Sequence, residues 1–81
     1  MENIKTIFIG ALPYKTTVQF LAQTFQPFGI VGEIKIFANW ENPTHEPYAL
    51  ITVNQPQQAV EQRDGFRIGS SHLRVHINQG V

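Results

Sequence analysis

The sequence contains no cysteine, which excludes a disulfide framework and any metal site built from thiolates. Charged residues are also scarce, at 15% of the chain, and the six basic residues equal the six acidic ones. The basic excess over a whole domain that usually accompanies nucleic-acid binding is therefore missing. Any attraction for phosphate must come from an uneven distribution of the few cations.

The sequence also lacks an apolar run long enough to span a membrane, and Met1 to Lys5 do not contain a signal-peptide core. We therefore expect an intracellular, cytoplasmic protein without a membrane partner. Hydrophobic residues make up 42% of the chain, which favours a folded domain over a disordered one. We expect one domain over residues 1–81, with a core from about 4 to 78 and a frayed end from Asn78.

The stretch from Ile7 to Leu12 predicts a short strand with an aromatic residue on its outer face. Side chains alternate across a strand, so Ile7 and Ile9 share one face. Phe8 shares the opposite face with Thr6 and Gly10. If the two isoleucines enter the core, a large aromatic ring lies on the side that the core does not use.

A helix is expected after this strand. Pro13 cannot donate a ladder hydrogen bond and ends the strand, and either Thr16 or Thr17 supplies the N-cap. Apolar residues at helical spacing predict one buried stripe, which consists of Val18, Leu21, Ala22 and Phe25. Pro27 ends the helix, and Phe28-Gly29 forms the exit.

Three further stretches alternate between apolar and polar residues and predict strands, namely Val31 to Phe37, Tyr48 to Val53 and His72 to Ile77. A second, shorter helix is expected over Gln57 to Arg63. The loop 38–47 carries Trp40 and His45. With the aliphatic side chains inward, the side chains expected on the outer face are Lys35, Phe37, Tyr48, Leu50, Arg74 and His76.

The element order is strand, helix, strand, strand, helix, strand, which is typical of the α+β, ferredoxin-like βαββαβ fold. Right-handed crossovers then place both helices on one face of a four-stranded antiparallel sheet, with the first and third strands in the middle. The other sheet face stays open.

The open face predicts a binding site for single-stranded nucleic acid, because flat bases stack on exposed rings and cations hold phosphates. We expect single-stranded RNA, with single-stranded DNA as a second candidate ligand, to contact Phe8, Tyr48, Leu50, Lys35, Phe37, Arg74, His76 and Trp40. Other roles stay open: the rings of Phe8 and Tyr48 can pack under a loop, and Trp40 can simply pin its own loop.

Two stretches resemble motifs of the RNA recognition motif family. Ile7 to Leu12 resembles its hexapeptide, whose pattern is aliphatic, aromatic, aliphatic, any residue, asparagine, leucine, and Glu46 to Val53 occupies the place of its octapeptide. Leu21 to Gly29, and the closing stretch from Asp64 to Gly69 through Leu73 to Val75, are also similar to that family. The resemblance implies RNA binding through the sheet, with Phe8 stacking on a base and Tyr48 packing near sugars or between nucleotides.

The sequence departs from that family's pattern in both motifs. Ala11 replaces the asparagine of the hexapeptide. In the octapeptide, Leu50 replaces a second stacking aromatic, Glu46 replaces a basic residue, and Pro47 replaces a glycine. Leucine has no π face and glutamate repels phosphate, so we expect weak binding of a few nucleotides.

Leu50 and Glu46 also favour the alternative of a protein-interaction module, including a homodimer formed through the sheet face. An enzyme such as an acylphosphatase shares the fold class but needs an arginine-bearing phosphate loop after the first strand, which Ala11 to Tyr14 does not supply. The histidines have no ligand set around them. We therefore expect no catalysis, no cofactor and no metal site.

Overall fold

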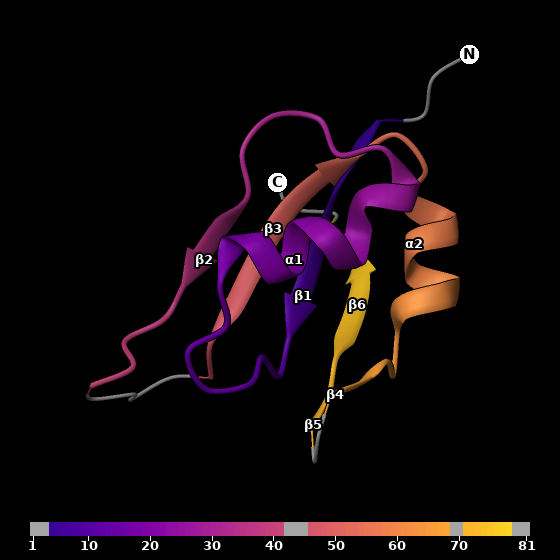
Figure 1. Cartoon of the computed structure of the whole chain (residues 1–81). Coiled ribbons are helices and arrows are strands. Elements are labelled where there is room, and N and C mark those ends of the chain that lie inside the picture. Colours follow the sequence, from indigo (N-terminus) through magenta and orange to yellow (C-terminus); the bar gives the residue numbers. More distant parts are fainter. Residues whose placement is uncertain (1–3, 42–45, 69–70, 79–81) are drawn as a thin grey trace.

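The computed structural model of the chain describes residues 4–41, 46–68 and 71–78. Four strands form one antiparallel sheet in the order β2-β3-β1-β6, with β1 at Lys5–Gly10, β2 at Lys35–Phe37, β3 at Tyr48–Val53 and β6 at Arg74–Ile77. The helices are α1 at Val18–Phe25, the 3₁₀ turn η1 at Gln26–Phe28, and α2 at Pro56–Arg63. This is the predicted ferredoxin-like βαββαβ arrangement (Figure 1).

The core lies between the sheet and the helices, which cover one of its faces (Figure 1). The strands bury most of the aliphatic side chains that alternation predicted, and α1 and α2 bury Leu21, Phe25 and Ala59 against them. Ile34, Ile36 and Ile77, which were also predicted to point inward, are only half-buried. The fully buried strand residues are Ile7, Ile9, Ala49, Ile51 and Val53. Both helices have eight residues, so in the described part of the chain no helix approaches the length of a membrane span.

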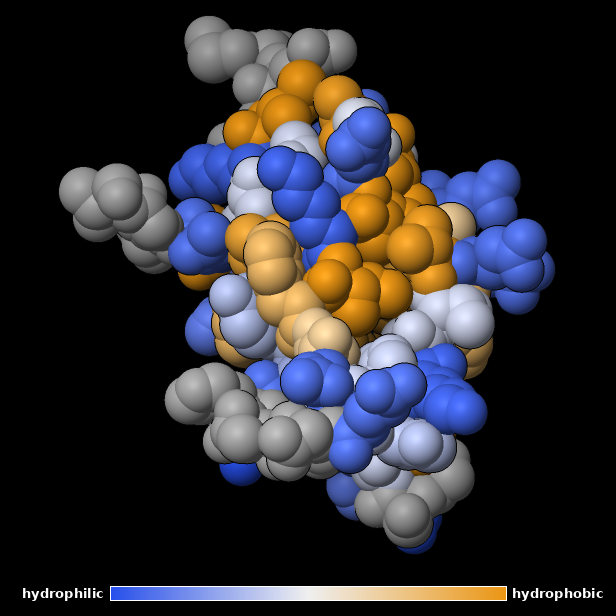
Figure 2. All heavy atoms as spheres, turned by 90° about the vertical axis from the view of Figure 1, so that its left-hand side faces the viewer, coloured by the Kyte–Doolittle hydropathy of each residue, from blue (hydrophilic) through white to orange (hydrophobic). Residues whose placement is uncertain are grey.

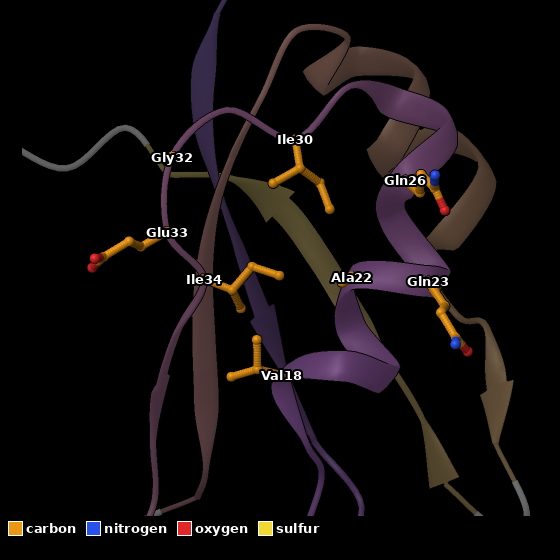
Figure 3. A pocket seen from close by; sticks show the side chains of 8 residues that line it. All are labelled: Val18, Ala22, Gln23, Gln26, Ile30, Gly32, Glu33 and Ile34. Atoms are coloured by element: carbon orange, nitrogen blue, oxygen red, sulfur yellow. The ribbon is translucent and has the colours of Figure 1, made fainter.

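Thr17 is the N-cap of α1, since its hydroxyl accepts a hydrogen bond from the backbone N–H of Phe20 at 3.1 Å. Leu21 and Phe25 are buried as predicted, but the prediction for Val18 is wrong, because that side chain is 48% exposed. Val18 belongs to the first turn and borders an open hollow between α1 and residues 30–34, where no side chain covers it (Figure 3).

That hollow has a volume of about 660 Å³ and is lined mainly by apolar side chains, among them Val18, Ala22, Ile30 and Ile34. Figure 2 shows apolar side chains gathered on this flank of the molecule and surrounded by polar ones. Glu33 points away from the hollow (Figure 3).

Strand β2 is shorter than predicted. The pairing of Ile30 with Val53 is an isolated bridge, and regular pairing begins only at Lys35 opposite Leu50. The chain advances five positions from Ile30 to Lys35, while β3 advances three, from Val53 to Leu50. Gly32, at a φ of 81°, lies in this gap and turns the two extra residues out of the ladder.

The last strand also differs from its prediction. His72 pairs with Arg67 in a small hairpin formed by β4, Arg67–Ile68, and β5, Ser71–His72, and only Arg74–Ile77 joins the main sheet. The backbone N–H of Val75 donates to the Asp64 carboxylate at 3.0 Å, so β6 has a partner on its outer side. That bond supports an edge strand that lacks a further neighbour in the sheet.

Some smaller predictions need correction or lie outside the described residues. Phe28 is not merely an exit residue but is buried in the core, since η1 continues the chain for three residues beyond α1. The second helix begins at Pro56, one residue earlier than predicted. The predicted frayed end began at Asn78, but the backbone N–H of Asn78 donates to the carbonyl of Thr6 at 2.9 Å. Residues 79–81 and His45 lie outside the described part of the chain.

Leu21 and Val18, both on α1, are expected to contribute very differently to stability. Leu21→Ala is expected to lower the free energy of unfolding by about 2–5 kcal/mol, because the side chain is fully buried. Val18→Ala, the control, is expected to change it by less than about 0.5 kcal/mol. Urea denaturation followed by circular dichroism measures both values, and similar losses for the two variants would contradict this register of α1.

Candidate nucleic-acid interface

Cross-strand pairing places the predicted strand residues on the sheet face opposite the helices. Phe8 lies opposite Leu50 on β3 and opposite His76 on β6. Phe37 lies opposite Tyr48, Lys35 opposite Leu50, and Arg74 opposite Gly10. Directly opposed residues share a face, so all seven side chains predicted from the strands lie on one surface. They are Phe8, Lys35, Phe37, Tyr48, Leu50, Arg74 and His76.

Four rings form a continuous row across this face, one from each strand of the sheet. The ring centroids of Phe37 and Tyr48 are 4.9 Å apart with planes at 19°, and those of Tyr48 and Phe8 are 5.2 Å apart with planes at 21°. Phe8 and His76 follow at 4.8 Å and 35°. We call Phe37, Tyr48, Phe8 and His76 the aromatic row. Each ring restricts its neighbour, so the row is ordered before any ligand arrives.

Gly10 makes the centre of the row possible. Tyr48 is not opposite Phe8 but opposite Gly10, two positions further along β1. Phe8 therefore has to lean along its own strand to reach Tyr48. A β-carbon built on Gly10 would lie 2.9 Å from Cε1 of Phe8, which is closer than real contacts allow. The missing side chain leaves the space that the ring of Phe8 occupies.

The face is accessible and its charges lie at the edges. Phe8, Tyr48 and Leu50 are half-buried, and Phe37 on the edge strand is 43% exposed. Lys35 on β2 and Arg74 on β6 are exposed and lie on the two edge strands of the sheet. No acidic residue is found among the strand residues that point to this face. Positive charge therefore flanks the aromatic row on both sides.

Trp40 is not part of the aromatic row. It is half-buried against the core, and its ring meets that of Tyr14 edge-on at 5.7 Å between centroids. Its predicted contact with RNA remains a prediction. Tyr14, which meets Trp40, and Gly10, which leaves room for the Phe8 ring, were not among the predicted site residues, although an aromatic beside Lys15 and a glycine two positions after Phe8 are visible in the sequence.

The described residues do not contain a group of three or more histidine or acidic side chains that could hold a metal ion. Among them, every buried polar side-chain atom has a hydrogen-bond partner. The free sheet face presents rings, hydroxyl groups and cations. Such a surface is suited to binding and stacking.

A half-covered βαββαβ sheet with a row of rings on its free face defines a class of domains that bind ligands on the sheet. The family model of the RNA recognition motif matches residues 7–74, so the chain belongs to the RNA recognition motif family. Members of this family are non-catalytic RNA-binding domains, and this chain is accordingly not an enzyme.

Relatives and solved structures agree with this assignment. The chain is 34% identical over 83 residues to the U1 small nuclear ribonucleoprotein 70 kDa of Dictyostelium discoideum, covering 98% of this chain and 18% of that protein. It therefore spans less than a fifth of that relative's length.

The fold is similar to the RRM of Rna15 with bound GU RNA, with a TM-score of 0.75, 18% identity, and coverage of 93% of this chain and 83% of that one. It is also similar to the C-terminal RRM of MEC-8 bound to AGCACA, with a TM-score of 0.74, 17% identity, and coverage of 96% and 94%. At these identities the two structures show the fold alone.

Because Gly10 leaves room for the Phe8 ring, Gly10→Ala is expected to lower the free energy of unfolding by about 1–3 kcal/mol through overpacking. In a Phe8→Leu background, which lacks the outer ring atoms, the same change is expected to cost about 1 kcal/mol less. A double-mutant cycle by urea denaturation measures this coupling. An equal cost of Gly10→Ala in both backgrounds would contradict the role assigned to this glycine.

Proposed function

We propose that the chain binds short single-stranded RNA across the open sheet face, by stacking bases on the aromatic row and holding phosphates at the sheet edges. The observation that carries this proposal is the continuous row of four rings flanked by cations. Exposed rings in contact with each other across a whole sheet leave apolar surface in water unless something flat covers them. Nucleobases are flat, and stacking on a ring contributes roughly 1–3 kcal/mol per base.

Each residue has a distinct role in this proposal. Phe8, at the centre of the row, stacks on one base, and Tyr48 packs against the neighbouring base or sugar. Phe37 and His76 extend the surface toward the two edges. Leu50 contacts a base without stacking, because it has no π face. Lys35 and Arg74 hold the backbone phosphates where the strand of nucleotides crosses the edges.

The solved relatives support this proposal, since two domains with this fold are described with bound RNA. The name of the Dictyostelium discoideum relative, a small nuclear ribonucleoprotein, also fits an RNA partner. Because stacking does not use the 2′-hydroxyl, single-stranded DNA is expected to bind as well. The chain is expected to discriminate less between RNA and DNA than a protein that contacts the 2′-hydroxyl.

We expect the binding to be weak. Leu50 occupies the octapeptide position at which that family has a second stacking ring, and Glu46 lies exposed just before β3, where its charge repels phosphate. The rings of the aromatic row also share part of their faces with one another. A protein partner or a homodimer through the same face is the competing function, and a concentration-dependent mass in the absence of RNA would favour it.

Phe8→Ala is expected to weaken the binding of short degenerate RNAs by about 1–3 kcal/mol, because it removes the central stacking ring. The fold is expected to stay intact, since Phe8 lies outside the core. Phe66→Ala is the matched control, as this exposed ring contacts Arg63 and lies apart from the row. Fluorescence anisotropy measures the affinities, and equal losses in both variants would contradict the sheet-face site.

Lys35→Ala and Arg74→Ala are each expected to lower the salt slope of RNA binding by about 0.7, the value for one phosphate contact on a single strand. Lys5→Ala is the control. Lys5 is exposed on β1, but it lies two positions before Ile7, so it shares the face of Ile7 and points away from the aromatic row. Affinities measured over a range of salt concentrations give the slopes. Unchanged slopes for Lys35→Ala and Arg74→Ala would show that these cations are only solvated.

A further inference from the structure

The backbone of the loop between β1 and α1 has an unusual conformation that hydrogen bonds and packing hold in place. Ala11 and Lys15 both adopt left-handed conformations, with φ of 57° and 59°, which residues other than glycine rarely do. Such conformations persist where the surrounding structure holds them, and they cluster at ligand-binding sites. Here the backbone N–H and the hydroxyl of Thr16 both donate to the carbonyl of Pro13, at 3.2 and 2.6 Å. The buried side chain of Leu12 anchors the start of the loop.

This fixed turn presents an aromatic residue and a cation to solvent. Tyr14 is 68% exposed, more than any other large hydrophobic side chain recorded as exposed in the described part of the chain. The Nζ atom of Lys15 lies 5.4 Å from the centroid of the Tyr14 ring. Trp40 meets that ring edge-on and is itself half-buried against the core, so it holds the exposed ring from one side.

The loop lies at the end of the sheet that carries Tyr48 and Phe37 of the aromatic row. It leaves β1 at Gly10, which is paired with Tyr48 and Arg74. Four residues of chain span at most about 14 Å, so the backbone of Tyr14 lies within that distance of Gly10. Trp40 follows Phe37 by three residues and lies within about 11 Å of it along the chain. A strand of nucleotides that leaves the sheet at this end can therefore reach the loop.

We propose that Tyr14 and Lys15, supported by Trp40, form a second nucleobase site at this end of the sheet. The ligand is a nucleotide of the same single strand, whose base stacks on the Tyr14 ring and whose phosphate meets the Lys15 ammonium group. This inference rests on the proposed RNA binding and extends it from the sheet to the loop. It predicts that affinity depends on RNA length, because a short RNA fills only the aromatic row.

The test compares a short RNA of about three nucleotides with one of about eight, each titrated against the whole chain. Tyr14→Ala is expected to weaken binding of the longer RNA by about fivefold or more, the lower end of what one stacked base contributes, and to leave the short RNA unaffected. Tyr14→Phe keeps the ring and is expected to bind like the unmodified chain. Phe8→Ala is expected to weaken both RNAs.

The outcomes separate this proposal from the one on which it rests. If Tyr14→Ala binds the longer RNA unchanged while Phe8→Ala weakens it, the loop site is refuted and the sheet site stands. Equal weakening of both RNAs by Tyr14→Ala also refutes the loop site, because the change then acts through the sheet. If the unmodified chain binds neither RNA, both proposals fall. An unchanged urea midpoint for Tyr14→Ala excludes unfolding as the cause.

Discussion

The register between β1 and β3 is the constraint on which the rest of the structure depends. Ile7 and Ile9 face Ile51 and Ala49 on the core side, so Phe8 must face the other side. A shift of one residue would turn the isoleucines into water and the ring into the core. Burial of the aliphatic side chains thus decides, without any ligand, that an aromatic residue lies on the free face of the sheet.

The free face then acquires its order from contacts among its own side chains. The ring of Phe8 leans over Gly10 to meet Tyr48, and the strands on either side add Phe37 and His76. A row in which each ring restricts the next loses little conformational freedom when a flat ligand covers it. The chain belongs to the RNA recognition motif family, which supports RNA as its ligand.

The formal net charge of zero is compatible with an RNA-binding role because charge is distributed by strand position. Lys35 and Arg74 lie on opposite edges of the sheet, and Lys15 lies on a loop at one end of it. Local attraction for phosphate needs cations beside the stacking surface, whereas an excess over the whole chain mainly adds long-range, sequence-independent affinity. The expectation of a cytoplasmic location is independent of this balance and remains a prediction.

Period-two alternation was enough to determine from the sequence which faces of β1 and β3 enter the core, because each choice between core and water is local to the strand. The order of the elements then predicted the fold. Other features needed contacts between distant segments. Val18 fits the helical period but lacks a neighbour to cover it, and β2 is shortened because Gly32 leaves the ladder. The leaning of Phe8 and the meeting of Tyr14 with Trp40 were likewise decided only by tertiary structure, since local patterns do not record which residue lies diagonally across a sheet or beside a loop.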